Sequence, residues 1–191
     1  MYMDEGLDTG DIILQEKVEI LSDETGGELW DRLSKIGSKL LVKTIDQIEK
    51  VEAPKVKQGN DFTMAPMIDR EMSKIDWRNK TALEIKNLVR ALNPIMGTYT
   101  FLNNKKIKIW KVDTITVEDF INKYPEFGEY KEKFDSVMEG TIIYVDIKEA
   151  LYIKAKDEII KILEIQAENS KKMSIQDFLR GNKVQVADRF V

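Results

Sequence analysis

Carboxylates and glycines crowd the segment 3–11, whose sequence is MDEGLDTGD, and these are the residues best placed to do chemistry. Gly6 and Gly10 allow the backbone to take left-handed or strained conformations, so the segment predicts a tight loop that presents Asp8. The apolar run Ile12-Ile13-Leu14 follows at once. A carboxylate held in this way could move protons or stabilise a neighbouring cation. A turn that Asp8 merely caps remains an alternative.

The composition leaves the chemistry to carboxylates. The chain contains no histidine and no cysteine, which removes the commonest general base, the thiol nucleophile and thiolate metal sites. The spacing of Asp4, Asp8 and Asp11 lacks the alternate acidic residues and the downstream glutamate of an EF-hand loop. We therefore expect no metal site.

Length and composition predict a folded chain of one domain with a sizeable core, or of two small domains. It has 191 residues, 42% of them hydrophobic and 34% charged, with a net charge of −4. No apolar run is long enough to cross a membrane. A secretory signal begins with basic residues followed by an apolar stretch, whereas the first eleven residues here are acidic. We expect a cytoplasmic location. Because only Met1 and Tyr2 precede the acidic loop, we also expect the chain to be the back part of a longer protein.

The first part of the chain predicts a strand and a long helix. Residues 12–20 are rich in β-branched side chains and predict a strand, whose exposure would make self-association possible. Apolar residues recur every three or four positions across 25–50, and Thr25 with Glu28 forms a capping-box sequence. Residues 51–72 have the composition of a linker.

The second part predicts a small barrel of the oligonucleotide-binding type. Residues 81–92 predict a helix with a second capping box, and residues 99–112 predict a hairpin around Asn103-Asn104. Further strands are expected at 141–145, 150–155 and 159–166, followed by a helix over 174–179 with Ser174 as its cap. The strand number fits several small barrels equally well.

Aromatic residues are concentrated in an acidic segment, 116–135, which Pro125 and Gly128 divide into two short helices. The segment is acidic overall, whereas a base-stacking platform needs a basic surface around its rings, so we expect these rings to form core. Trp77 is expected to anchor packing.

Lysines form two groups in the second half of the chain, which is neutral overall from residue 93. They are either solvated side chains or a phosphate-contacting face, and both interpretations stay open. Trp110, on the lysine-rich strand, is the better candidate for stacking on a base, although a buried position is favoured. The candidate residues are Lys105, Lys106, Lys108, Lys111, Lys171 and Lys172.

The sequence DEGLDTGD followed by Ile12-Ile13 resembles the folate-site loop of the formyltransferases that use 10-formyltetrahydrofolate, and more closely that of the methionyl-tRNA formyltransferases. The Ile95-Met96 pair departs from the Trp-Pro that this family often has there. Landmarks that look like those of the family's C-terminal domain follow in order: Ile75-Asp76-Trp77, Arg90-Ala91-Leu92-Asn93-Pro94, Gly97 to Tyr99, Lys108 to Lys111, Glu139-Gly140-Thr141-Ile142 and Lys172 to Gly181.

The resemblance implies an α/β fold followed by a mostly β domain. Residues 1–50 would be the end of a Rossmann-like formyltransferase catalytic domain, and residues 51–72 a linker. Residues 73–191 would form an OB-fold-like barrel, with a helical insertion near 116–135.

The resemblance also implies an activity, the transfer of a formyl group from 10-formyltetrahydrofolate to the amino group of initiator methionyl-tRNA. Asp8 would be catalytic, Leu7, Asp8, Thr9 and Gly10 would line the folate site, and the lysines would contact the tRNA. In this family an asparagine and a histidine upstream of the loop work with the aspartate. Since this sequence has no histidine, we expect the chain alone to be inactive.

Two other functions stay open at this point. One is that of a sugar-nucleotide N-formyltransferase, although the helix expected over 174–181 favours the tRNA enzyme. The other is that of a non-catalytic RNA-binding or interaction module that keeps only the barrel.

Overall fold

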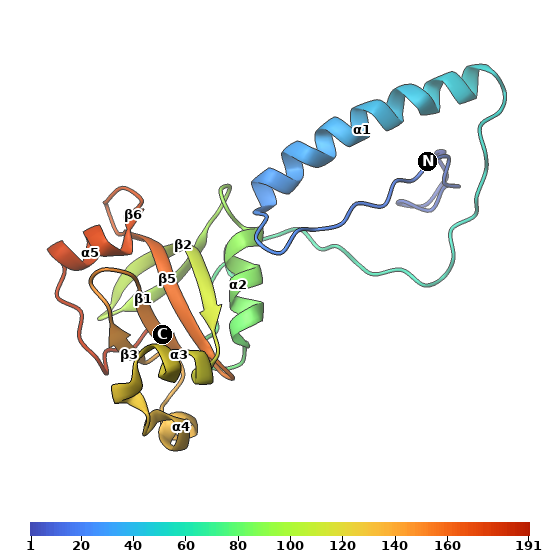
Figure 1. The fold of residues 1–191 in the computed structure, drawn as a ribbon. Helices are drawn as coiled ribbons and strands as arrows, with labels where there is room; N and C mark the ends of the chain where they lie inside the picture. Colours follow the sequence, from blue (N-terminus) through green and yellow to red (C-terminus); the bar gives the residue numbers. More distant parts are fainter. The chain divides into compact units, whose positions relative to one another are not determined.

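The computed structural model describes all residues from 1 to 191 and divides into two compact units (Figure 1). The first contains residues 1–24 and 28–68, and the second contains residues 25–27 and 69–191. The helices are α1 (Gly26–Glu49), α2 (Ala82–Ala91), α3 (Val117–Lys123), α4 (Tyr130–Lys133) and α5 (Ile175–Gly181), with short 3-10 turns η1 (Pro125–Phe127) and η2 (Phe134–Ser136). The strands are β1 (Thr98–Leu102), β2 (Lys105–Ile115), β3 (Ile142–Val145), β4 (Leu151–Lys154), β5 (Ile159–Ala167) and β6 (Met173–Ser174).

The first unit contains the predicted long helix but not the predicted strand. Residues 12–20 form no strand, so that prediction was wrong. Only Ile12 pairs, through main-chain hydrogen bonds of 2.8 and 3.0 Å with Val56. A strand needs a neighbour along its whole length, and this segment finds one at a single residue. Self-association through an exposed strand here therefore loses its basis.

Helix α1 spans the expected residues, yet none of them is buried. Its apolar stripe follows the helical period, but Leu33, Leu41, Ile45 and Ile48 are all exposed. Residues 51–72 contain neither helix nor strand. The domain boundaries expected at residues 50 and 72 remain predictions.

The second unit is built on a six-stranded antiparallel sheet in the order β1-β2-β5-β4-β3, with β6 paired to β5. The hairpin of β1 and β2 turns at Asn103 and Asn104, whose φ angles are 51° and 63°. Asparagine tolerates this left-handed region, which a two-residue hairpin turn requires. The predicted hairpin and the three later strands are confirmed.

The C-terminal segment joins the two edge strands of this sheet. Val191 exchanges two main-chain hydrogen bonds of 2.9 Å with Phe101 of β1. On the other edge, the main-chain N–H of Phe190 donates to the carbonyl of Gly140, and that of Ile142 to the carbonyl of Asp188, each at 2.8 Å. The main-chain groups that edge strands usually leave unpaired are thus partly satisfied.

The inner face of the sheet holds the main core. Ile109, Ile153, Ile160 and Ile162 are wholly buried there, and α2 packs Ile85 onto the same cluster. Helix α2 starts with the predicted capping box between Thr81 and Glu84. Trp77 is buried, as expected, and its indole Nε1 donates to Thr100 Oγ1 at 2.9 Å.

A second core lies on the outer face of β3 and β4, where α3, α4 and the turns between them cover the sheet. Phe120 is fully buried and lies with its ring centroid 5.2 Å from that of Tyr152 and 5.4 Å from that of Phe127. The expectation that the aromatic segment forms core is confirmed. No helix in the chain combines the length and apolar character that crossing a membrane would require.

Candidate functional site

The loop that carries Asp8 is tight, as the two glycines predicted. Asp8 itself has a φ of 57°, in the left-handed region, and Gly10 is buried against Tyr2, whose carbonyl an added Cβ would strike. The main-chain N–H of Tyr2 donates to the carbonyl of Asp11 at 2.9 Å, which closes the loop. The main chain therefore leaves no room for a side chain at position 10.

Gln58 fixes the main chain of this loop from a distant part of the sequence. Its side-chain amide donates to the carbonyl oxygens of Asp8 and Gly10, at 2.7 and 2.8 Å. Sequence reasoning missed Gln58, because a glutamine in a linker-like segment carries no local sign of a partner 50 positions away.

The side chains of the loop remain available to a ligand. Leu7 is 97% exposed, and Asp8 and Thr9 are exposed as well. The Asp8 carboxylate makes no hydrogen bond or ion pair, so it can accept a proton or face a cation. The four residues expected at the folate site, 7 to 10, are brought together because they are consecutive in the loop. No cluster of three metal-ligating side chains forms.

Lys106 and Lys108 separate two hollows on the outer face of the second unit. One, of about 450 Å³, is lined among others by Arg70, Tyr99 and both lysines. The other, of about 200 Å³, is lined by the same lysines and by the 166–169 segment. Of the six candidate lysines, only these two line the hollows; Lys105, Lys111, Lys171 and Lys172 are exposed on this unit but line neither hollow.

Aromatic rings hold the ammonium groups of this surface in place. Lys106 Nζ lies 3.8 Å from the ring centroid of Tyr99, and Lys108 and Lys172 lie 5.3 and 5.5 Å from that of Trp110. These are cation–π contacts, so the lysines and the bases of a nucleic acid would compete for the same ring faces. Trp110 is half-buried and its indole donates to Gln166 Oε1 at 2.9 Å.

Gly97 leaves the room that the indole ring of Trp110 occupies. Its φ is +66°, and an added Cβ would lie 2.7 Å from the indole ring of Trp110. Lys108 Nζ also donates to the carbonyl of Met96 at 3.0 Å. Sequence reasoning found the lysines but missed Arg70 and Tyr99, whose contribution depends on the folded hairpin.

A polar network beneath the helical insertion is structural rather than reactive. Tyr124 donates to Asp146 Oδ2 at 2.8 Å and lies 3.1 Å from the hydroxyl of Tyr152. Burial raises the pKa of Tyr124, and these hydrogen bonds raise it further. Burial alone would raise the pKa of Asp146, but the hydrogen bonds from Tyr124 and the main chain lower it overall. The phenol thus stays neutral and the carboxylate charged.

Comparison with known proteins connects both units to one family. The family model described as "Formyl transferase, C-terminal domain" matches residues 67–183, and that described as "Formyl transferase" matches residues 1–45. A protein named methionyl-tRNA formyltransferase from Carboxydothermus hydrogenoformans is 40% identical over 191 residues, which are 100% of this chain and 56% of the relative. The chain spans about half the length of the curated relatives it matches.

Solved structures share the fold. HypX from Aquifex aeolicus, crystallised in complex with tetrahydrofolic acid, superposes with a TM-score of 0.58 over 96% of this chain and 32% of its own, at 13% identity. The N-formyltransferase from Helicobacter canadensis, in complex with folinic acid and dTDP-3-aminofucose, superposes with a TM-score of 0.55 over 87% of this chain and 53% of its own, at 23% identity. With one family model covering most of the second unit and the other the start of the first, the chain belongs to the formyl transferase family.

Proposed function

We propose that this chain is the C-terminal part of a methionyl-tRNA formyltransferase, which transfers a formyl group from 10-formyltetrahydrofolate to the amino group of methionine on the initiator tRNA. The observation that carries the proposal is the 40% identity, over all 191 residues, to a relative with this name. A structural neighbour crystallised with tetrahydrofolic acid is consistent with a folate-derived donor.

In the proposed reaction, the methionine amine attacks the formyl carbon, the bond from that carbon to N10 of the donor breaks, and tetrahydrofolate leaves as N10 takes up a proton. Asp8 would supply negative charge and a proton acceptor beside the reacting groups. Its carboxylate is exposed and unpaired, while Gln58 holds the main chain on either side of Thr9. A fixed carboxylate favours the charged form of a neighbouring base and can relay its proton through water. The main-chain groups of Leu7 to Gly10 would line the pocket for the donor.

The second unit would bind the tRNA. Lys106 and Lys108 present ammonium groups that Tyr99 and Trp110 hold in position, and phosphate contacts of this kind supply affinity without reading the base sequence. Residues 73–191 would form a barrel of the OB type, which the bridging of β1 and β3 by the C-terminal segment supports. Residues 1–50 would belong to the catalytic domain, and residues 51–72 would link the two.

A sugar-nucleotide N-formyltransferase remains the alternative enzyme. The Helicobacter canadensis protein shares the fold at 23% identity, which is a lower level than the 40% of the tRNA enzyme. A module that binds RNA without catalysis would share the lysine surface but not the need for Asp8.

The test is the binding of the 191-residue chain to uncharged initiator tRNA at two salt concentrations, beside dTDP-linked amino sugar as the competing ligand. The double variant Lys106→Gln/Lys108→Gln should reduce the slope of log affinity against log salt by about two, since each phosphate contact contributes roughly 0.9. The matched control, Lys131→Gln/Lys183→Gln, removes two exposed lysines away from the hollows and should leave the slope unchanged.

Salt-insensitive binding of the sugar nucleotide, with none of the tRNA, would contradict the proposal and favour the alternative enzyme. Equal effects of the two double variants would mean that net charge, rather than this surface, governs binding.

A further inference from the structure

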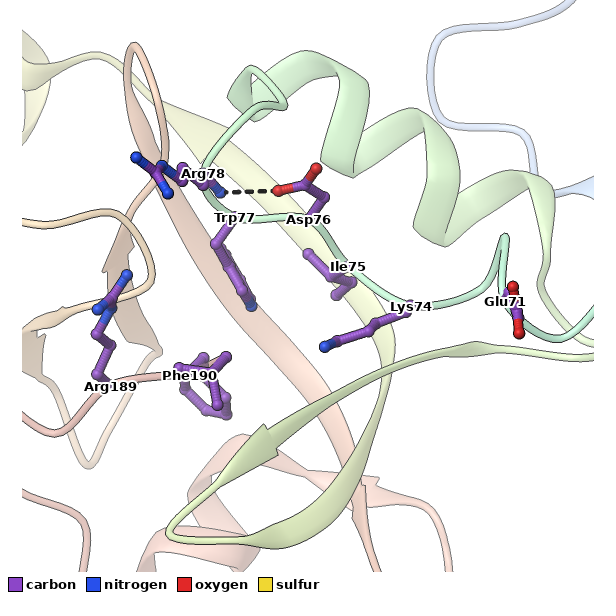
Figure 2. Close-up of a pocket in the computed structure, with 9 residues that line it drawn as sticks. Glu71, Lys74, Ile75, Asp76, Trp77, Arg78, Arg189 and Phe190 are labelled. Carbon is purple, nitrogen blue, oxygen red and sulfur yellow. Dashed lines mark hydrogen bonds between the residues drawn. The ribbon is translucent and has the colours of Figure 1, made fainter.

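A groove distinct from the lysine surface lies between residues 71–78 and the C-terminal segment (Figure 2). Its volume is about 420 Å³. The buried rings of Trp77 and Phe190 form its base, with centroids 5.8 Å apart. Lys74, Arg78 and Arg189 line it as well, and we call it the Trp77 groove.

The fold brings these three cations together from two segments more than a hundred positions apart. Residues 74–76 run beside β1, where Lys74 pairs with Tyr99 and the main-chain N–H of Ile75 donates to the carbonyl of Tyr99 at 2.9 Å. Successive side chains of this segment point to opposite sides, so Ile75 and Trp77 are buried while Lys74 and Arg78 are exposed. Arg189 arrives from the C-terminal segment, where its Nε donates to the carbonyl of Glu139 at 2.9 Å.

Three acidic groups also line the groove, Glu71, Asp76 and the α-carboxylate of Val191, and none of them forms an ion pair with either arginine. The main-chain oxygen of Val191 already accepts from the N–H of Phe101 at 2.9 Å and from Thr100 Oγ1 at 3.1 Å. The Asp76 carboxylate accepts from the main-chain N–H groups of Arg78 and Asn79, at 3.2 and 3.1 Å, and from the Asn79 amide at 2.9 Å. Figure 2 shows it directed away from Trp77. Glu71 lies beyond Lys74, at the opposite end of the groove from Arg78 and Arg189 (Figure 2).

The donors that remain are suited to an anion with several oxygens. The Arg78 guanidinium makes no ion pair or hydrogen bond, and Arg189 keeps its terminal N–H groups free after the contact of its Nε. Lys74 Nζ lies 5.7 Å from the ring centroid of Phe101, a weak contact that a ligand could replace. A carboxylate offers two oxygens in one plane, whereas a phosphate offers three or four in a tetrahedral arrangement, which suits donors that approach from different directions.

We propose that the Trp77 groove binds a phosphate group. This site is separate from the lysines of β2, and it does not depend on the proposed formyl transfer. The phosphate could come from an RNA backbone or from a small phosphorylated molecule, and the two sources can be told apart by experiment.

The experiment is an NMR titration of the 191-residue chain, following the indole N–H signals of its three tryptophans at constant ionic strength. The probes are inorganic pyrophosphate, adenosine 5′-monophosphate and a short single-stranded RNA. Trp77 reports on the groove, since its indole N–H donates to Thr100 beneath it. Trp110 reports on the lysine surface, and Trp30, 71% exposed on α1, reports on non-specific effects.

We expect a saturable shift of the Trp77 signal. Arg78→Gln should weaken the binding by about tenfold, as expected when one charge-assisted hydrogen bond is lost. Arg180→Gln is the matched control, because Arg180 is an exposed arginine on α5 paired with Asp177 outside the groove. It should leave the affinity unchanged. Arg78 has no contact in the fold to lose, so its variant should remain folded.

Shifts with pyrophosphate or the mononucleotide would identify a small phosphorylated ligand, and shifts with RNA alone would identify a backbone phosphate. Absence of a saturable Trp77 shift with all three probes would overturn the proposal, as would an equal loss of affinity in Arg180→Gln. A response of Trp110 to RNA without one of Trp77 would leave the proposed tRNA binding intact and reject the groove alone.

Discussion

Replacing Gly140 by alanine tests whether the C-terminal segment holds the sheet closed. Gly140 has a φ of +82°, and its carbonyl accepts the main-chain N–H of Phe190 at 2.8 Å. An added Cβ would collide with the Phe190 carbonyl and lie 3.3 Å from Cγ of Trp77. A substituted residue in this left-handed region costs about 1–2 kcal/mol, and a lost hydrogen bond about 1 kcal/mol more. We expect the free energy of unfolding to fall by about 3 kcal/mol.

The assay is equilibrium unfolding in urea, followed by the fluorescence of the buried Trp77. Gly181→Ala is the matched control, since Gly181 ends α5 with nothing within 4 Å of an added Cβ and no positive φ. Alanine there should be neutral or stabilise by up to about 1 kcal/mol. If Gly140→Ala lost less than about 1 kcal/mol, or if Gly181→Ala lost as much, the reasoning about closure would be refuted.

Three further outcomes are expected. Phe120→Ala should lower the free energy of unfolding by about 3–5 kcal/mol, because the ring is fully buried among other rings; a loss below about 1 kcal/mol in urea unfolding would contradict this packing. Burial raises the pKa of Tyr124 in the folded state. The stability that the neutral phenol contributes is therefore fully present below the unfolded pKa of about 10 and is lost as the pH rises above that value. As the pH rises above about 10, the urea midpoint should therefore decline less in Tyr124→Phe than in the unsubstituted chain. An identical decline in both proteins would refute the raised pKa of Tyr124. The purified 191-residue chain should form no formyl-methionyl-tRNA in a radiolabel assay, since it has no histidine; measurable turnover would show that Asp8 needs no such partner.

Local chemistry explains why much of the second unit could be predicted. The capping residues Thr81 and Ser174 bond to main-chain groups three positions later, so their signals lie within one turn of sequence. The Asn103-Asn104 turn depends on the conformational tolerance of two adjacent residues. The aromatic insertion was recognised as core because its many rings stand in an acidic segment rather than a basic one.

Predictions failed or stayed incomplete where a residue depends on a distant partner. Residues 12–20 have the composition of a strand but meet a neighbour only at Val56. The burial of Lys154 at the end of β4 was not predicted, and its Nζ lies 4.0 Å from the ring centroid of Phe134. Desolvation lowers the pKa of this lysine, while its ammonium donates to the carbonyls of Ala155 and Lys156.

The sequence by itself determined the available chemistry: carboxylates without histidine or cysteine, a glycine-bounded loop around Asp8, and lysines beside aromatic residues on one strand. Only the tertiary structure decided which side chains act together. It brought Gln58 to the Asp8 loop, placed Lys106 over Tyr99, and set Arg189 in the same groove as Arg78. The physical reason is that caps and turns are encoded within a few residues, whereas contacts between distant segments exist only after the sheet has closed and the chain entropy has been overcome.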